Sequence, residues 1–359
     1  MHLDEIRLTR RGLLQAAAGA GLAAVLPGSL AERRAEAAAA GSARRIVFPW
    51  LVPDDPTSLA SLQQHAHLIS HLSPTWYTMA PDLSIASEAW DSVIQLARDR
   101  KISLHPLIRN QGFDPKVAQQ ILKSPQQRAV AAERMAELVL DYDYGGINVD
   151  FEGPFGSSRD ELTDLIARVA AHLRPASKWV SVDVVAQIRP GSAYQHKRDR
   201  WAEPYDYGAL GHVSDAVVIM AYDYAYEKPG PISPLWWLRE VLTFARSRIP
   251  ASKLVMGLPF YGRHWITQGK HVVNFRGLHQ SEALDLLARS GAHLQRPAQD
   301  ATPRFSWRDG EGEHIVHYED EQSLAAKLKE VKAAGVAGVA LWRLGQEQPS
   351  QWDVIARSL

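Results

Sequence analysis

Cysteine is absent from this chain of 359 residues, which excludes disulfide bonds, thiolate metal sites and a cysteine nucleophile. An excess of charge of either sign is also absent, because 40 Lys and Arg balance 40 Asp and Glu. A chain without net charge does not attract nucleic acid or an anionic membrane, so we expect a neutral partner. The 14 histidines show no HExxH or comparable ligand spacing, so we expect no metal ion and no other cofactor.

A hydrophobic run long enough to span a membrane is missing as well. The N-terminal stretch LTRRGLLQAAAGAGLAAVLPGSLA has paired arginines, Arg10 and Arg11, before a Gly- and Ala-rich apolar segment. This segment is shorter than the roughly 20 residues that a spanning helix requires. The pattern resembles a twin-arginine export signal. It predicts that residues 1–41 are a signal and linker, that the protein is extracytoplasmic or secreted, and that it has no stable membrane insertion after cleavage.

Short β-rich apolar runs alternate with amphipathic helical patterns from residue 45 onward. Eight strands are predicted, at 45–52, 73–79, 102–108, 146–152, 179–186, 215–222, 253–262 and 335–344. Helices are predicted at 58–70, 89–101, 129–142, 160–173, 236–249, 323–335 and 351–359. This alternation predicts an α/β fold, a (β/α)8 TIM barrel over residues 42–359. The alternative, a doubly wound open sheet, would need a Gly-rich phosphate turn after the first strand, and PWLVPDDPTS has none.

One interval breaks the alternation, between the seventh strand and its helix. Residues 263–318 contain PRFSWRDGEGEHIVHYED, which is typical of a β-hairpin turning at Asp309-Gly310. We expect a small α+β insertion here that forms one wall of a cleft, because βα loops lie at the catalytic face of such barrels. The alternative is a surface excursion without a role in the site.

Two carboxylates lie inside the apolar strand GINVDFE, residues 146–152. Strand side chains alternate, so Asn148, Asp150 and Glu152 should face the barrel axis while their neighbours pack outward. Glu152 comes last, at the strand end where these barrels keep catalytic groups. The alternative is an internal hydrogen-bond network that only stabilises the barrel. Stability rarely requires two carboxylates held side by side, which favours a functional site.

Several motifs resemble those of glycoside hydrolase family 18. GGINVDFE is similar to the family signature DGxDxDxE, with Gly145 and Asn148 standing where the first two aspartates would be. The segments LHPLIRN, MAYDYAY with PGPISP, GLPFYGRHW, HYEDEQSL and GVALWRLGQE resemble the branch of spore-germination and spore-cortex-lytic glycosidases. The resemblance covers residues 45–359 in order and implies the same barrel with its insertion.

The resemblance implies an exported glycosidase that hydrolyses β-linked N-acetylhexosamine glycans such as peptidoglycan or chitin, with retention and substrate assistance. Glu152 would be the general acid and then the base, and Asp150 would hold the acetamide N–H of the substrate. Tyr222 would hydrogen-bond the acetamide oxygen, and Asp223 would tune the same region. The partner would be a glycan containing N-acetylglucosamine, and we expect a monomer. N-linked glycans remain an alternative substrate.

Aromatic side chains provide flat faces for sugar rings. Trp342 matches the family's tryptophan beneath the reacting sugar, while Trp50 and Trp76 lie at strand ends and could equally be core residues. Other residues that match family positions near the cleft are Asn110, Tyr261 and Arg263. An alternative function is a catalytically silent, lectin-like member of the family. Such members usually lack the acid at the position of Glu152, which this chain retains.

Overall fold

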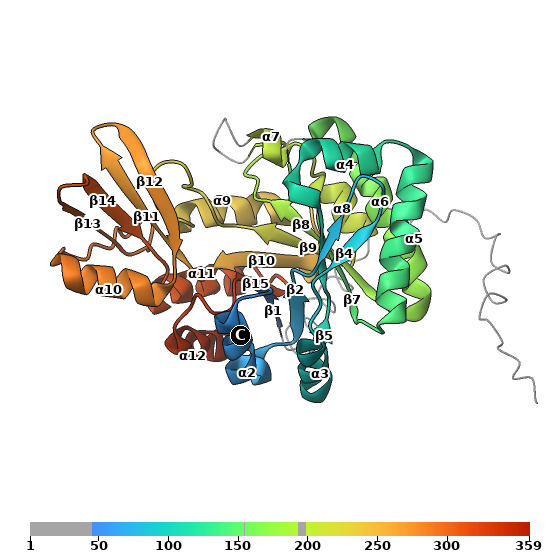
Figure 1. The fold of residues 1–359 in the computed structure, drawn as a ribbon, viewed down its shortest axis with the longest axis horizontal. Helices are drawn as coiled ribbons and strands as arrows, with labels where there is room; N and C mark the ends of the chain where they lie inside the picture. The colour runs from blue at the N-terminus through green and yellow to red at the C-terminus, as the bar shows by residue number, and fades with distance from the viewer. Residues whose placement is uncertain (1–44, 154, 193–198) are drawn as a thin grey trace, which may run out of the picture. The chain divides into compact units, whose positions relative to one another are not determined.

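Eight parallel strands form a barrel in the computed structural model, which describes residues 45–153, 155–192 and 199–359 (Figure 1). The barrel strands are β1 (Ile46–Leu51), β2 (His71–Pro74) with β3 (Tyr77–Met79), β5 (Ser103–Leu104) with β6 (Leu107–Asn110), β7 (Gly146–Asp150), β8 (Trp179–Val185), β9 (Ala216–Met220), β10 (Leu254–Pro259) and β15 (Gly338–Trp342). All eight predicted strands are therefore present. The predicted export signal, residues 1–41, lies outside the described residues.

The strand pairing runs round a closed ring. β1 pairs with β15 on one side and with β2 on the other, and the order continues through β6, β7, β8, β9 and β10 back to β15. The ring closes because β2 and β3 are consecutive pieces of the second barrel strand, and β5 and β6 of the third. A short strand, β4 (Ile85–Ser87), pairs antiparallel with β3. The predicted barrel is confirmed.

Helices cover the outside of the barrel. They are α2 (Pro56–His65), α3 (Asp91–Arg100), α4 (Pro115–Leu122), α5 (Pro125–Asp141), α6 (Arg159–Leu173), α7 (Asp199–Ala202), α8 (Tyr207–Val213), α9 (Leu235–Arg246), α11 (Glu321–Ala333) and α12 (Pro349–Ser358). The sequence did not predict α4, α7 and α8, which span eight, four and seven residues. Such lengths show little of the helical period. No helix in the described part of the chain is long and apolar enough to cross a bilayer.

The side chains of the barrel strands divide as alternation predicts. In β7, the outward-facing Ile147 and Val149 are buried in the main core together with Phe151. The inward-facing Asn148 is hydrogen-bonded to Ser181 on the neighbouring strand β8 and, across the barrel interior, to Ser73 on β2. Because all the strands are parallel, their carboxyl ends meet at one end of the barrel, where loops can bring polar groups together.

The predicted insertion is confirmed as a four-stranded antiparallel sheet with one helix, and Figure 1 shows it to one side of the barrel. Its elements are β11 (Gly262–Gln268), β12 (His271–Leu278), α10 (Gln280–Ser290), β13 (Arg304–Arg308) and β14 (Glu313–His317), and the sheet order is β12-β11-β14-β13. The hairpin between β13 and β14 turns at Asp309, whose N–H donates to Gly312 O at 3.1 Å. A small core of its own includes Leu278, Phe305 and Val316.

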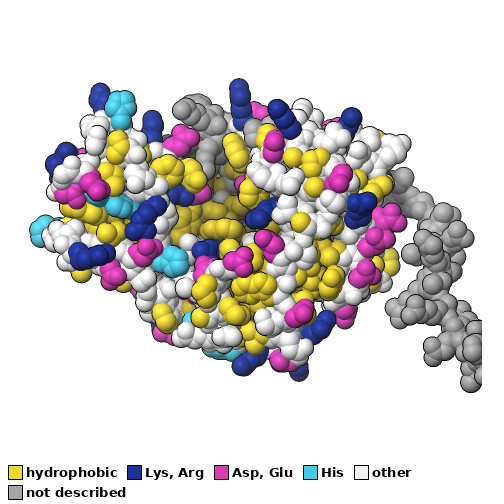
Figure 2. All heavy atoms as spheres, viewed as in Figure 1, with side chains coloured by type: hydrophobic (Ala, Val, Ile, Leu, Met, Phe, Trp, Pro, Cys, Tyr) yellow, Lys and Arg dark blue, Asp and Glu magenta, His cyan; other side chains and the backbone are white. Residues whose placement is uncertain are grey.

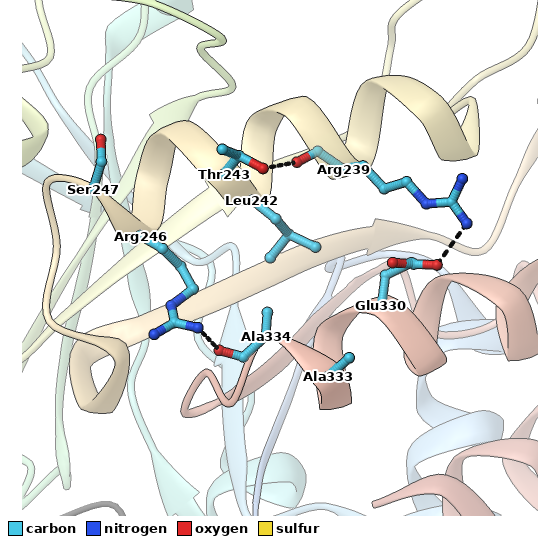
Figure 3. Close-up of a pocket in the computed structure, with 8 residues that line it drawn as sticks. All are labelled: Arg239, Leu242, Thr243, Arg246, Ser247, Glu330, Ala333 and Ala334. Atoms are coloured by element: carbon cyan, nitrogen blue, oxygen red, sulfur yellow. Dashed lines mark hydrogen bonds and ion pairs between the residues drawn. The ribbon is translucent and has the colours of Figure 1, made fainter.

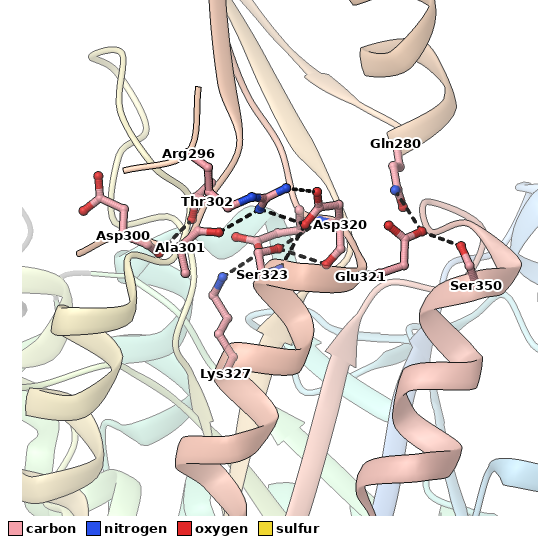
Figure 4. Close-up of polar contacts among 11 residues, drawn as sticks. Gln280, Arg296, Asp300, Ala301, Thr302, Asp320, Glu321, Ser323, Lys327 and Ser350 are labelled. Carbon is pink, nitrogen blue, oxygen red and sulfur yellow. Dashed lines mark hydrogen bonds and ion pairs between the residues drawn. The ribbon is translucent and has the colours of Figure 1, made fainter. Parts of the chain in front are cut away.

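A buried polar cluster joins the insertion to α11 (Figure 4). Lys327 Nζ donates to Glu319 Oε2 at 2.6 Å, and both side chains are almost completely buried. Ser323 Oγ donates to the same carboxylate oxygen at 2.6 Å. Arg296, from the insertion, forms an ion pair with Asp320, which caps α11. Buried charges are stable only when paired, so this cluster fixes where the insertion leaves the barrel.

Candidate active site

A cavity of about 400 Å³ opens at the carboxyl ends of the barrel strands. Figure 2 shows hydrophobic side chains gathered in the hollow in the middle of this face. The lining residues come from six of the barrel strands and the segments after them: Trp50, Phe113, Asp150, Glu152, Asp183, Val185, Trp201, Met220, Tyr222, Asp223, Tyr226 and Trp342. Six of the residues that the sequence singled out are therefore brought together here.

Asp150 and Glu152 lie side by side in this cavity. Asp150 ends β7 and is 5% exposed, and its Oδ1 has no hydrogen-bond partner within the described residues. Glu152 follows in the loop and is half-buried. The backbone of Glu152 is held by Asn110, whose Oδ1 accepts from Glu152 N at 2.9 Å and whose Nδ2 donates to Glu152 O at 3.0 Å. Asn110 therefore positions Glu152 rather than lining the cavity.

Asn148 lies one layer deeper and links four strands. Its Oδ1 accepts from Trp50 Nε1 at 3.1 Å and from Ser73 Oγ at 2.8 Å. Its Nδ2 donates to Asp183 Oδ1 at 2.7 Å and to Ser181 Oγ at 3.0 Å. Since an indole N–H can only donate, the amide oxygen must face Trp50 and the amide NH₂ must face Asp183. Asn148 is thus a fixed support beneath the cavity.

The electrostatics around Asp150 are set by three of the four carboxyl groups that line the cavity, those of Asp150, Glu152 and Asp183. Burial raises the pKa of Asp150 well above its usual range, and the charge of Asp183 raises it further. Burial likewise raises the pKa of Asp183 to about 8. The hydrogen bond from Asn148 lowers this pKa, and the charge of Glu152 raises it. The positive charge of Arg109 lowers the pKa of Asp150. At neutral pH these groups cannot all be ionised.

Tyr222 and Asp223 line the cavity from the loop after β9. Burial, with the charge of Asp183, raises the pKa of Tyr222 well above its usual range, so its hydroxyl stays a hydrogen-bond donor. Asp223 has a left-handed backbone, with φ of 58°. It accepts from Arg263 Nη2 at 2.9 Å and from the hydroxyl of Tyr261. Tyr261 and Arg263 are both buried, so they support Asp223 from behind.

Three aromatic rings form one wall of the cavity. Trp342 is half-buried and lies nearly parallel to Tyr222, with ring centroids 6.4 Å apart and planes at 27°. Trp50 meets Trp342 edge-on at 5.6 Å. Trp76 is elsewhere: it is 1% exposed within the main core and does not line the cavity. Trp342 and Trp50 can therefore contact a ligand in this cavity, and Trp76 cannot.

Several cavity residues were not found from the sequence, Asp183 above all. The segment WVSVDVVA contains one charged residue among apolar ones, and its alternation with Ser181 places Asp183 toward the axis. Phe113 ends a three-residue 3-10 helix after β6, Trp201 lies in the four-residue helix α7, and Tyr226 lies in the loop after β9. These segments are too short or too irregular for a periodicity to indicate which way a side chain points.

Gly145 and Gly146, at the start of the signature, stand where the barrel interior leaves no room. A Cβ at Gly145 would lie 2.2 Å from Ser103 Oγ, and one at Gly146 would lie 2.0 Å from Trp179 O. Both distances are far shorter than a van der Waals contact. The space that the first aspartate of the signature would need at position 145 is occupied here by the side chains of Ser103 and the buried His105. The departure at Gly145 thus lies deep in the barrel, away from the cavity.

No group of three or more His, Asp or Glu side chains that could hold a metal ion occurs among the described residues. A second hollow, of about 500 Å³, lies on the outside of the barrel between α9 and α11 (Figure 3). It is bridged by Arg239 Nη2, which lies 2.7 Å from Glu330 Oε1. It contains no cluster of carboxyl groups or aromatic rings, so the cavity at the strand ends is the stronger candidate.

A barrel with paired carboxylates and aromatic rings at its strand ends is an arrangement that glycoside hydrolases use. The family profile of the glycosyl hydrolases family 18 matches residues 91–347, and the chain belongs to this family. The resemblance inferred from the sequence is therefore confirmed.

Sequence relatives include glycosylases and lytic enzymes of Bacillus as well as chitinases. The chain is 27% identical over 290 residues to YdhD of Bacillus subtilis, which is named as a sporulation-specific glycosylase; the match covers 79% of this chain and 67% of YdhD. It is 26% identical over 255 residues to the cortical fragment-lytic enzyme of the same organism, covering 69% of this chain and 58% of that enzyme.

Solved structures share the fold. A chitinase from Chromobacterium violaceum superposes with a TM-score of 0.79 at 24% identity, covering 88% of this chain and 99% of the chitinase. A class V chitinase from Nicotiana tobaccum, solved in complex with NAG4, gives a TM-score of 0.71 at 17% identity, covering 88% of this chain and all of that chain. Members of the family thus bind N-acetylglucosamine oligomers.

Proposed function

We propose that this protein is an exported glycosidase that hydrolyses β-linked N-acetylglucosamine glycans, such as peptidoglycan or chitin, by a retaining, substrate-assisted mechanism. The observation that supports this most directly is that Glu152, Asp150 and Tyr222 line one cavity together with Trp342. A sugar ring resting on Trp342 would place its acetamido group toward these polar side chains. Family membership supplies the reaction class, since the chain is a family 18 glycoside hydrolase.

In the first step, Glu152 protonates the glycosidic oxygen of the leaving sugar. The carbonyl oxygen of the substrate's own acetamide attacks the anomeric carbon as the glycosidic bond breaks, which forms a cyclic oxazolinium ion. Asp150 accepts a hydrogen bond from the acetamide N–H and stabilises the positive charge, and Tyr222 donates to the acetamide oxygen. Glu152, now ionised, then takes a proton from a water molecule that attacks the anomeric carbon and restores the acetamide.

The environment of Asp150 favours this route over a protein nucleophile. Burial and the charge of Asp183 raise the pKa of Asp150 well above its usual range. A carboxylate in this cavity lies beside a second carboxyl group, so it is stabilised by a neighbouring positive charge such as that of the oxazolinium ion. Asp150 is better suited to hold the acetamide than to attack the sugar.

Three substrates digested in parallel test the proposed function: purified peptidoglycan, chitin oligomers and an N-glycosylated protein. We expect mass spectrometry to detect fragments with a new reducing-end N-acetylglucosamine from peptidoglycan or chitin. The names of the sequence relatives favour peptidoglycan. Binding of a glycan without any release of fragments would contradict the proposal and favour a lectin-like function.

Export is part of the proposal and has a matched internal control. Three pairs of arginines occur within the first 45 residues: Arg10-Arg11 in the proposed signal, and Arg33-Arg34 and Arg44-Arg45 beyond its apolar segment. Because the export machinery recognises only the first pair, Arg10→Lys/Arg11→Lys should retain the protein inside the cell while Arg33→Lys/Arg34→Lys should not. Immunoblots of cell fractions measure this, and equal export of both variants would contradict the twin-arginine route.

A further inference from the structure

Asp183 is a further carboxyl group in the cavity, on the strand next to that of Asp150. In β8, Val182 and Val184 pack outward in the main core, whereas Asp183 faces the axis and lines the cavity. Asp183 is 1% exposed, and neither it nor Asp150 forms an ion pair with Lys or Arg among the described residues. Burial of two unpaired carboxyl groups in one cavity is costly and calls for an explanation.

Asp183 is held in one orientation by Asn148. Because Trp50 fixes the amide of Asn148, its Nδ2 must donate to Asp183 Oδ1, at 2.7 Å. The other oxygen, Asp183 Oδ2, has no hydrogen-bond partner in the described part of the chain, and neither has Asp150 Oδ1. A buried carboxyl oxygen without a donor is unfavourable unless the carboxyl group carries or accepts a proton. Trp50 also lowers the pKa of Asp183 as a hydrogen-bond donor. Because Asp183 Oδ2 and Asp150 Oδ1 both lack a donor among the described residues, the pair has room for one proton.

Four further titratable groups face the pair. The negative charge of Glu152, in the loop after β7, raises the pKa of Asp183. The positive charge of Arg109, on β6, lowers the pKa of Asp150. The other two, Tyr205 before α8 and Tyr222 after β9, are buried phenols whose pKa values are raised by burial and by these carboxylates, so they stay neutral. Arg263 is paired with Asp223, so among the described groups around Asp150 and Asp183 one cation, Arg109, is opposed to three carboxyl groups. Asp150, Glu152 and Asp183 therefore cannot all be ionised at neutral pH.

We propose that Asp183 is a positioning residue for the reaction: it shares one proton with Asp150 and takes that proton when Asp150 accepts the acetamide N–H of the substrate. The role in turnover rests on the proposed function, whereas the shared proton does not. The transfer breaks one O–H bond on Asp150 and forms one on Asp183, so the net charge of the pair does not change. Asp150 then becomes an anion next to the developing oxazolinium without two buried negative charges.

The shared proton can be tested by NMR without any substrate. In protein labelled with ¹³C at the aspartate side-chain carboxyl, we expect one resonance that titrates far above the usual aspartate range and disappears in Asp183→Asn. In Asp150→Asn, the midpoint of the Asp183 resonance should fall by about 1 to 2 pH units, because a neighbouring carboxyl group is gone. An unchanged midpoint would overturn the proposal whatever the activity of the enzyme.

The role in turnover is tested by pH profiles of kcat for Asp183→Asn. Removing a negative charge lowers the pKa of the carboxyl groups that remain, so the profile should move to lower pH by about 1 to 2 units. The double variant Asn148→Asp/Asp183→Asn returns a carboxyl group to the layer beneath Asp150 and should restore the wild-type profile. Ser181→Ala is the control, because it removes a partner of Asn148 without changing charge and should leave the midpoints in place.

Thermal melting confirms that each variant is folded. A profile of Asp183→Asn that coincides with the wild-type profile would overturn the role in turnover. If NMR shows the shared proton but the wild-type protein hydrolyses no N-acetylglucosamine substrate, the proposed function is wrong while the carboxyl pair stands.

Discussion

Glu152→Gln is expected to lower kcat by about 100- to 10 000-fold, because it replaces the proton donor by an amide that cannot give up a proton to the leaving oxygen. The side chain keeps its size and its place in the loop, since Asn110 holds the backbone of Glu152 rather than its carboxylate. Binding of N-acetylglucosamine oligomers should therefore remain within a few-fold of wild type. Steady-state kinetics on a chromogenic substrate and calorimetric titration of the oligomer measure the two effects.

A matched control for this variant is Glu137→Gln, which removes an exposed carboxylate on α5 far from the strand ends. It should leave both kcat and binding unchanged. Substrates with a good leaving group, which need little protonation, should also lose less rate in Glu152→Gln than natural oligomers do. Full activity of Glu152→Gln on natural oligomers would contradict the assignment of the acid.

Substrates that lack the N-acetyl group are expected to be hydrolysed more than about 1000-fold more slowly by the wild-type enzyme, because the intramolecular nucleophile is then missing. The nucleophilicity of the N-acetyl group can also be decreased in steps. Replacing the acetyl methyl hydrogens by one, two and three fluorines withdraws electrons from the carbonyl oxygen, so kcat should fall at each step. Kinetics on this series with a common leaving group provide the measurement.

The same series distinguishes the roles of the two carboxylates. In Asp150→Asn, the acetamide is no longer held by a carboxylate, so the rate should depend less on the N-acetyl group than in wild type. In Glu152→Gln the dependence should persist, because the nucleophile is untouched. Efficient cleavage of plain glucosides by the wild-type enzyme would contradict the substrate-assisted mechanism.

The barrel was predictable because its signals are local and repeated. Each strand is a short apolar run such as GINVDFE, and most of the helices show an amphipathic period, which identifies alternating β and α elements without knowledge of contacts. The helices α4, α7 and α8 were missed because they are short. Alternation within β7 also predicted that Asn148 and Asp150 face inward, which the structure shows.

The cavity was only partly predictable, because its composition depends on which strands are neighbours. The place of Asp183 in the cavity can be recognised only once β8 is known to lie beside β7, where Asn148 Nδ2 donates to Asp183 Oδ1 at 2.7 Å. Trp76 shows the opposite case. It lies just before β3, near a strand end, as an aromatic platform would, yet it is buried in the main core. Pattern alone does not show whether an aromatic ring faces the axis or the helices.

Proton NMR of the first product released from a β-linked N-acetylglucosamine oligomer tests the central claim most directly. Substrate-assisted attack inverts the anomeric carbon twice, so the new reducing end should first appear as the β anomer and convert to the α anomer only by slow mutarotation. The account predicts an early excess of the β signal. An early excess of the α anomer would mean direct attack by water, and would contradict the mechanism assigned to Glu152 and Asp150.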